Sequence, residues 1–574
     1  MEEKSRLRSK VVLAWLAGLL VLSALMANSY LYMDLSENPL EVGAFAGTCS
    51  IASRAWVKVG FLSWAKDFHY YPPGYYAWLT AWMNPYERTG LPGLVMWSNV
   101  LVVLGLLGMV AAMIRSGANA AGVAAALFLL GGTPIFNIAT KTLSFEIGVL
   151  FATGGVLWLL SGPTGLPSRP RSALLGAIVG LGLLMKWTVV LYIAGPFVVA
   201  SFLWFRGGGT WREGALRLGL AIAMTLVVAG PWYGLCLDFE LLKQTTQNDA
   251  TVPAGLGFRG YVLQYCRYLE SLRVGSGIAL CGVFLLGLGF GLVRRPPGTA
   301  LFLSSAVVAM AVLPMFMHQE HRYLIPLLPS LAAIAGLGFG GLHFSEAIFA
   351  AALTGLVATY QIADSTWHNY YWATAYYRPG HQPAYDDDMR MVWPPKVASH
   401  LFLRCKMLAH ALAQYGEQLH FGVHPLNPNP GLDAQALGFY SHSDERADDE
   451  ALFLGYDWTG YCSFLKDMEE GRLTFLIMSA RSFWVEGQTA RQVVRTAWSY
   501  VDQGGQGVRC DGAQAPPEPF AFDAIRRQYT ILETLAVDRD EIWLMVRRDV
   551  WARTHGQFPV SPLPKAEEFG LPAK

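Results

Sequence analysis

The sequence predicts a polytopic α-helical membrane protein followed by a mixed α/β domain. Of its 574 residues, 53% are hydrophobic and only 15% are charged, whereas charged residues make up about 25% of a typical soluble domain. Apolar stretches of about 20 residues can cross the hydrocarbon core of a bilayer as helices, and such stretches recur up to residue 362. After Asp364 the apolar runs shorten to the length of strands, and helix-like segments alternate with them.

About eleven membrane-spanning helices are expected in the first part of the chain, residues 1–362. Their expected ranges are 11–33, 92–113, 119–139, 143–161, 173–188, 189–205, 215–234, 276–293, 299–317, 323–341 and 344–362. The stretch 173–205 could form one long helix or two short ones. The first span is too long for a cleaved signal peptide and shows no clear small-residue cleavage site, so we expect it to be retained.

Lysine and arginine residues predict how the helices cross the membrane, because they concentrate in cytoplasmic loops. The segment before the first span is basic, which places the N-terminus in the cytoplasm. Alternate crossing then brings most later arginines to the same side: Arg115, Arg169, Arg171, Arg206, Arg212, Arg217, Arg294 and Arg295. The exterior side receives a long first loop, 34–91, a second loop, 235–275, and everything after residue 362.

Residues 363–574 are expected to form a soluble exterior domain, periplasmic in a bacterium. Strand-length apolar runs occur at 419–423, 452–456, 473–478 and 541–546. Helix-like segments at 396–416 and 489–503 lie between them. Strands that alternate with helices are typical of a mixed α/β domain.

Composition excludes several classes of function. The seven cysteines form no CxxC and no Cys/His ligand spacing, which argues against a zinc site or thioredoxin-type chemistry. A formal net charge of +1 gives no strongly basic surface for nucleic acid. No Asn-x-Ser/Thr sequon is present, which weakly favours a bacterial inner membrane over a eukaryotic lumen.

The first exterior loop begins with carboxylates close to the membrane. Asp34, Glu37 and Glu41 follow the first span. An acid just beyond a membrane helix is commonly a solvated end residue. However, an exterior carboxylate beside an apolar surface can also act as a general base toward a hydroxyl or amine acceptor.

The same loop ends in DFHYYPPGYYAWLTAWM, residues 67–83. The two prolines could start a helix, because proline is tolerated in a first turn. Behind them Tyr75, Trp78 and Trp82 recur at roughly helical spacing. The pattern predicts an interfacial helix that lies in the plane of the headgroups.

A second polar cluster, HQEHR, stands directly before the tenth span and contains His318, Glu320, His321 and Arg322. Such residues at a helix end often anchor the interface. They also suit an anion site, since arginine offers a fork of donors matched to phosphate and histidine can donate a hydrogen bond near neutral pH. Glu320 could then hold a histidine or the arginine in place.

Lys186, in GLLMKWT, lies between two apolar runs. A charge at such a position is costly and is usually functional or paired. If 173–205 breaks at this point, Lys186 reaches the same exterior face as HQEHR, where it could bind a lipid phosphate. The alternative is a lysine that only reaches the lipid headgroups.

Together these stretches resemble the GT-C glycosyltransferases, in particular the bacterial protein-mannosyltransferase-like and aminoarabinose-transferase-like group. The resemblance rests on the acidic first loop from Asp34, YYPPGYYAW at 70–78, GLLMKWT at 182–188 and HQEHRYLIPLLP at 318–329. The arrangement of expected helices is similar over about 360 residues, whereas the sequence motifs are similar only in these short stretches. It implies a GT-C-type transmembrane domain in residues 1–362 and an enzyme that transfers a hexosyl or pentosyl group from a polyprenyl-phosphate sugar at the exterior face.

The resemblance also assigns roles to residues. The phosphate-binding residues would be Lys186 and Arg322, with His318 and His321. The catalytic base would be Asp34 or Glu41, because the paired carboxylate usual in the family's first loop is missing here. A divalent metal is therefore not favoured either, because such a cation needs several oxygen ligands. Supporting residues would be Glu37, Asp67, His69, Tyr71 and Glu320.

Two other functions remain open at this point. A transporter or flippase would use Lys186 as a coupling or substrate charge at the midplane, but the sequence shows no inverted repeat. A lipid-linked glycan ligase or polymerase is a closer alternative. The acceptor could be a lipid, a glycan or a protein.

Overall fold

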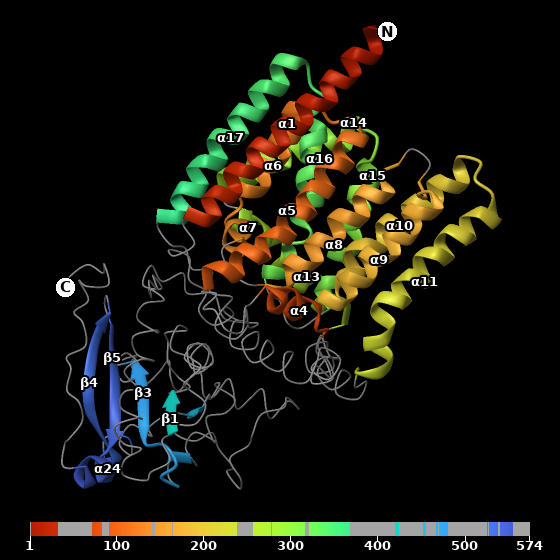
Figure 1. Ribbon diagram of the computed structural model, residues 1–574. Coiled ribbons are helices and arrows are strands. Elements are labelled where there is room, and N and C mark those ends of the chain that lie inside the picture. The colour runs from red at the N-terminus through yellow and green to blue at the C-terminus, as the bar shows by residue number, and fades with distance from the viewer. Residues whose placement is uncertain are drawn as a thin grey trace. The chain divides into compact units, whose positions relative to one another are not determined.

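The computed structural model describes the helical part of the chain and a smaller set of strands (Figure 1). The described residues are 2–31, 72–82, 91–140, 144–162, 165–237, 257–276, 278–315, 321–367, 420–423, 452–454, 467–468, 470–479, 525, 527–537 and 540–554. The chain divides into two compact units, one that holds the helices up to residue 367 and one that holds the strands. The domain boundary expected at 362/363 stays a prediction. The last helix of the first unit continues past this point to Trp367.

The first unit is a bundle of helices, many of them apolar. They are α1 (Glu2–Leu31), α4 (Gly74–Ala81), α5 (Leu91–Arg115), α6 (Ala120–Gly132), α7 (Pro134–Ala139), α8 (Phe145–Leu160), α9 (Arg169–Met185), α10 (Val189–Arg206), α11 (Trp211–Leu235), α13 (Gly257–Ser276), α14 (Ile278–Arg294), α15 (Thr299–Val312), α16 (Leu328–Gly340) and α17 (Phe344–Trp367), with 3₁₀ turns η2 (Leu313–Met315) and η3 (His321–Leu324). Within the described residues, five helices are long and apolar enough to cross a membrane, and five shorter helices are also apolar. The expected polytopic helical architecture is therefore confirmed.

The helix boundaries refine several expectations. The stretch 173–205 forms two helices, α9 and α10, because Lys186 adopts an extended backbone conformation between them. The span expected at 119–139 is divided into α6 and α7 at Thr133. Helix α13 lies in the segment expected to be an exterior loop, and its sequence GFRGYVLQYCRYLESLRVGS is too polar for a membrane span.

Small residues allow the helices of the bundle to approach closely. Helix α5 packs along α8, and α9 packs along α11 (Figure 1). A Cβ atom placed on Gly108 of α5 would lie 2.5 Å from the Gly154 carbonyl oxygen of α8, and one placed on Gly154 would overlap the Gly105 carbonyl of α5. Membrane helices associate by such close backbone contacts, because lipid supplies no hydrophobic driving force between them.

We expect Gly154→Ala to destabilise the protein by about 1–3 kcal/mol, since the added methyl group must push two backbones apart. Gly289→Ala is the matched control, because no atom lies within 4 Å of the Cβ position at Gly289 in α14. There the gain in helix propensity, about 1 kcal/mol, is the only expected effect. Thermal unfolding of the two variants in detergent measures the difference, and equal melting temperatures would contradict the close contact.

The second unit contains a five-stranded sheet in the order β2-β1-β3-β5-β4. Its strands are β1 (His420–Val423), β2 (Leu452–Leu454), β3 (Phe475–Ser479), β4 (Tyr529–Val537) and β5 (Asp540–Arg547), followed by α24 (Arg548–Arg553). Strands β1, β2 and β3 are parallel, and β5 is antiparallel to both β3 and β4. The four predicted strands are present, and the helices expected at 396–416 and 489–503 lie outside the described residues.

Strand β4 was not predicted, because a charged side chain interrupts its apolar pattern. Glu533 lies in the middle of the strand, where a β-bulge between Ile531 and Glu533 shifts the register against β5. At the start of β4 the Tyr529 hydroxyl donates a hydrogen bond to the Leu473 carbonyl at 2.7 Å. Burial raises the pKa of this tyrosine, so it remains a neutral donor that fixes the strand.

Candidate functional site

Lys186 lies at the break between α9 and α10. Its backbone N–H still caps α9 by donating to the Gly182 carbonyl at 2.9 Å, but its extended φ and ψ angles, −163° and 131°, end the helix. The side chain is 5% exposed. A buried ammonium group needs a partner, because an isolated charge is expensive to remove from water.

The partner of Lys186 is Glu146, in the first turn of α8. The Lys186 Nζ donates to Glu146 Oε1 in an ion pair, and the glutamate is 1% exposed. The second carboxylate oxygen, Oε2, accepts a hydrogen bond from the Ser144 hydroxyl at 2.5 Å. Each oxygen of the carboxylate therefore has its own donor, which fixes the orientation of the ion pair.

The HQEHRYLIP stretch reaches this ion pair through Tyr323 in η3. Lys186 Nζ lies 4.7 Å from the centre of the Tyr323 ring, a cation–π distance. The Tyr323 carbonyl accepts a hydrogen bond from the Tyr192 hydroxyl of α10 at 2.5 Å. In turn the Tyr192 carbonyl accepts one from Ser305 of α15 at 2.7 Å. The turn that carries Arg322 is thus held beside Lys186 by α10 and α15.

The Pro-Pro helix, α4, reaches the same pair from another direction. The Tyr75 hydroxyl accepts a hydrogen bond from the Ser144 N–H at 3.1 Å and shares a second one, at 2.7 Å, with Ser98 of α5. A Cβ atom on Gly74 would lie 2.7 Å from the backbone of Leu184, two positions before Lys186 in the chain. Only glycine permits α4 to approach the end of α9 this closely.

Three of the four stretches singled out in the sequence therefore meet at one buried ion pair. YYPPGYYAW contributes Tyr75, GLLMKWT contributes Lys186, and HQEHRYLIPLLP contributes Tyr323. For His321 and Arg322 the structure describes the backbone but not the side chains. The other expected site residues lie outside the described residues: Asp34, Glu37, Glu41, Asp67, His69, Tyr71, His318 and Glu320.

Sequence reasoning missed Glu146. It is a single acid in the apolar segment FEIGVLFATGGVLWLL, whose hydropathy alone predicts a membrane span. The signal was present, because an ionisable residue inside such a segment is usually functional and usually has a partner. Lys186 is the matching base in the next span of the expected series.

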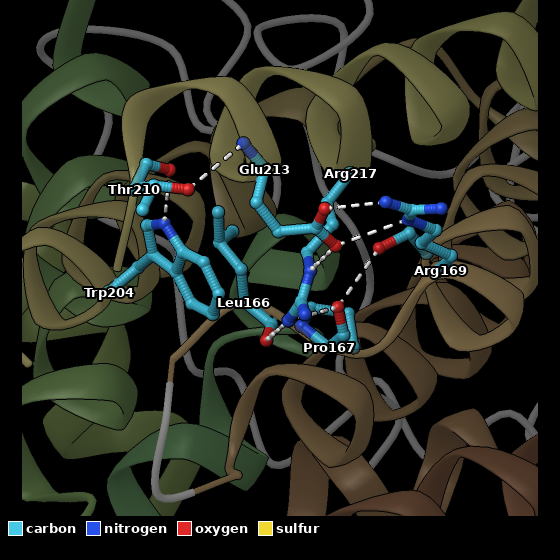
Figure 2. Close-up of polar contacts among 8 residues, drawn as sticks. Leu166, Pro167, Arg169, Trp204, Thr210, Glu213 and Arg217 are labelled. Atoms are coloured by element: carbon cyan, nitrogen blue, oxygen red, sulfur yellow. Dashed lines mark hydrogen bonds and ion pairs between the residues drawn. The ribbon is translucent and has the colours of Figure 1, made fainter. Parts of the chain in front are cut away.

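A separate polar cluster joins the opposite end of α9 to α11 (Figure 2). Glu213 accepts hydrogen bonds from Arg169 at 2.8 Å and from Arg217 at 2.9 Å. The Arg217 guanidinium also lies 4.3 Å from the centre of the Trp204 ring and donates to the carbonyls of Leu166 and Pro167. These arginines, expected on the cytoplasmic side, are engaged in holding α9, α10 and α11 together.

The length of α9 separates this arginine cluster from the ion pair. Helix α9 has 17 residues, and a helix rises about 1.5 Å per residue, so its two ends lie about 25 Å apart. That distance is close to the thickness of the hydrocarbon core, about 30 Å. If the arginines lie at the cytoplasmic surface, Lys186 lies near the exterior one, as the charge pattern predicts.

Comparison with known proteins gives a curated mannosyltransferase and solved structures with a similar fold. No family model matches the chain. GPI mannosyltransferase 4 of Eremothecium gossypii is 28% identical over 219 residues, which span 36% of this chain and 40% of that enzyme. ArnT from Cupriavidus metallidurans in the apo state superposes with a TM-score of 0.53 at 14% identity, over 93% of this chain and 98% of ArnT.

A second structure, ArnT from the same organism bound to undecaprenyl phosphate, has a TM-score of 0.50 at 13% identity and covers 92% of this chain and 97% of ArnT. At this level of identity the likeness concerns the fold.

Proposed function

We propose that this chain, which has the GT-C fold of ArnT, is a membrane glycosyltransferase that moves a sugar from a polyprenyl-phosphate donor to an acceptor. The transfer takes place at the exterior face and inverts the anomeric configuration. The proposed location is a bacterial inner membrane with the N-terminus in the cytoplasm. A eukaryotic membrane is the alternative, given the yeast relative.

The observation that carries the proposal is the buried Lys186, at the end of α9 opposite the arginine cluster. It offers an ammonium group in a poorly hydrated site, next to the turn that holds Arg322. Positive groups in such a site stabilise the negative charge that develops on a departing lipid phosphate. In the proposed mechanism Lys186 and Arg322, with His318 and His321, bind the donor phosphate, and the polyprenyl chain lies among the helices.

A carboxylate from the first loop completes the proposed mechanism. Asp34 or Glu41 takes a proton from the acceptor, which attacks the anomeric carbon from the side opposite the phosphate. A bond forms between the acceptor oxygen or nitrogen and the sugar, while the bond between the sugar and the phosphate breaks. The polyprenyl phosphate leaves with the electron pair.

We expect Asp34→Asn or Glu41→Gln, whichever removes the base, to lower transfer by about 100-fold or more while the donor still binds. The assay incubates the purified protein with tritium-labelled polyprenyl-phosphate hexoses and pentoses and with membranes that supply acceptors. Mass spectrometry of the lipid that copurifies with the protein identifies the donor lipid. Full activity in both variants would contradict the mechanism, and movement of a solute without a glycosylated product would indicate a transporter.

A further inference from the structure

The ion pair between Lys186 and Glu146 affects how a phosphate could bind to the lysine. The phosphate proposed to bind Lys186 would find the ammonium group already engaged by a buried carboxylate. Glu146 cannot easily move away, because Ser144 holds its second oxygen at 2.5 Å and Tyr75 holds the backbone of Ser144. A bound phosphate must therefore share Lys186 with a fixed anion.

Sharing is possible, because a lysine ammonium group carries three donors. Charge-assisted N–H···O bonds are about 2.8 Å long, so two anions bound to one nitrogen lie within about 5 Å of each other. At the effective dielectric constant of about 20 that describes partly buried sites, the repulsion between two such charges exceeds the net strength of one hydrogen bond. Glu146 therefore weakens phosphate binding more than it helps by orienting the lysine.

We propose that Glu146 is a positioning residue that acts as a resident counter-anion of Lys186 and limits the affinity of the site for lipid phosphate. This inference rests on the proposed function. When the site is empty, Glu146 neutralises the buried ammonium and keeps it at the end of α9. When polyprenyl phosphate is the leaving product, repulsion by Glu146 promotes its release, so that a new donor can bind.

The test measures the dissociation constant of undecaprenyl phosphate for the full-length protein in detergent, by native mass spectrometry. We expect Glu146→Gln, which keeps an acceptor of the same shape and removes the charge, to bind this lipid at least about tenfold more tightly, with a slower dissociation rate. General damage to the fold would instead weaken binding. Binding that is unchanged or weaker in Glu146→Gln would overturn the inference.

Two further variants keep the test decisive. Thr153→Val is the matched control, because Thr153 is a buried residue of the same helix, 2% exposed, and its replacement should leave the affinity unchanged. Glu146→Asp withdraws the carboxylate by one methylene and should tighten binding by a smaller factor, about threefold. It serves as the second measurement if Glu146→Gln does not fold.

A double variant separates this inference from the proposed function. Lys186→Met/Glu146→Gln removes both charges of the pair and should bind undecaprenyl phosphate at least about tenfold more weakly than Glu146→Gln, from which it differs only at Lys186. If the two variants bind equally well, the donor phosphate does not contact Lys186 and the proposed site fails. If the double variant binds more weakly than Glu146→Gln while Glu146→Gln binds no more tightly than the wild type, only the role of Glu146 fails.

Discussion

Replacing Lys186 with methionine is expected to lower the free energy of unfolding by about 3–5 kcal/mol, because it leaves the Glu146 carboxylate buried without its partner. Both side chains are almost completely buried, at 5% and 2% exposure. The remaining hydrogen bond from Ser144 does not replace the lost positive charge. Equilibrium unfolding in mixed detergent micelles, followed by tryptophan fluorescence, measures the loss.

The double variant Lys186→Met/Glu146→Gln should recover most of this stability. Replacing a whole buried ion pair with groups of similar volume is often neutral or even stabilising. The stability of the double variant and its weak binding of lipid phosphate would then show that the pair is retained for its chemistry. A double variant as unstable as Lys186→Met alone would indicate that the lysine stem, with its contact to the Tyr323 ring, stabilises the fold.

Much of the helical architecture could be predicted from the sequence, because each membrane helix must be apolar along its own length. The sequence left open whether 173–205 forms one helix or two, and the extended backbone of Lys186 divides it into α9 and α10. Helix α13 was not predicted, because its sequence is amphipathic rather than continuously apolar. Strand β4 was not predicted, because the charged Glu533 interrupts its apolar sequence pattern. The amphipathic pattern of α13 is itself a local signal for a helix, whereas β4 depends on its pairing with β5.

The site was harder to predict, because its parts come together only through tertiary packing. Hydropathy and charge identified Lys186 as a candidate but could not show that Glu146 is its partner. The contact requires that α8 and α9 lie side by side with their charged ends level, and it depends on contacts such as Gly148 against Met185. The sequence likewise placed Tyr75 on an interfacial helix, whereas the structure gives it a buried hydroxyl that supports Ser144.

Gly74 of α4 determines where its neighbour Tyr75 lies. We expect Gly74→Val to reduce sugar transfer by about 100-fold, since a displacement of about 1 Å near a catalytic site can have this effect. A Cβ atom at Gly74 would lie 2.7 Å from the carbonyl carbon and oxygen of Leu184, which are backbone atoms and cannot rotate away. The valine must move α4 outward, and Tyr75 with it.

The consequence passes along a short chain of contacts. Moving Tyr75 withdraws the hydroxyl that accepts the Ser144 N–H, and Ser144 then no longer fixes Glu146 against Lys186. Because α4 has only eight residues, its displacement should lower the melting temperature only slightly, although activity falls strongly. Gly219→Val in α11, where no atom lies within 4 Å of the Cβ position, is the matched control and should retain transfer. If Gly74→Val is as active as this control, the position of α4 does not determine the geometry of the ion pair, and the contact between Tyr75 and Ser144 has no part in the reaction.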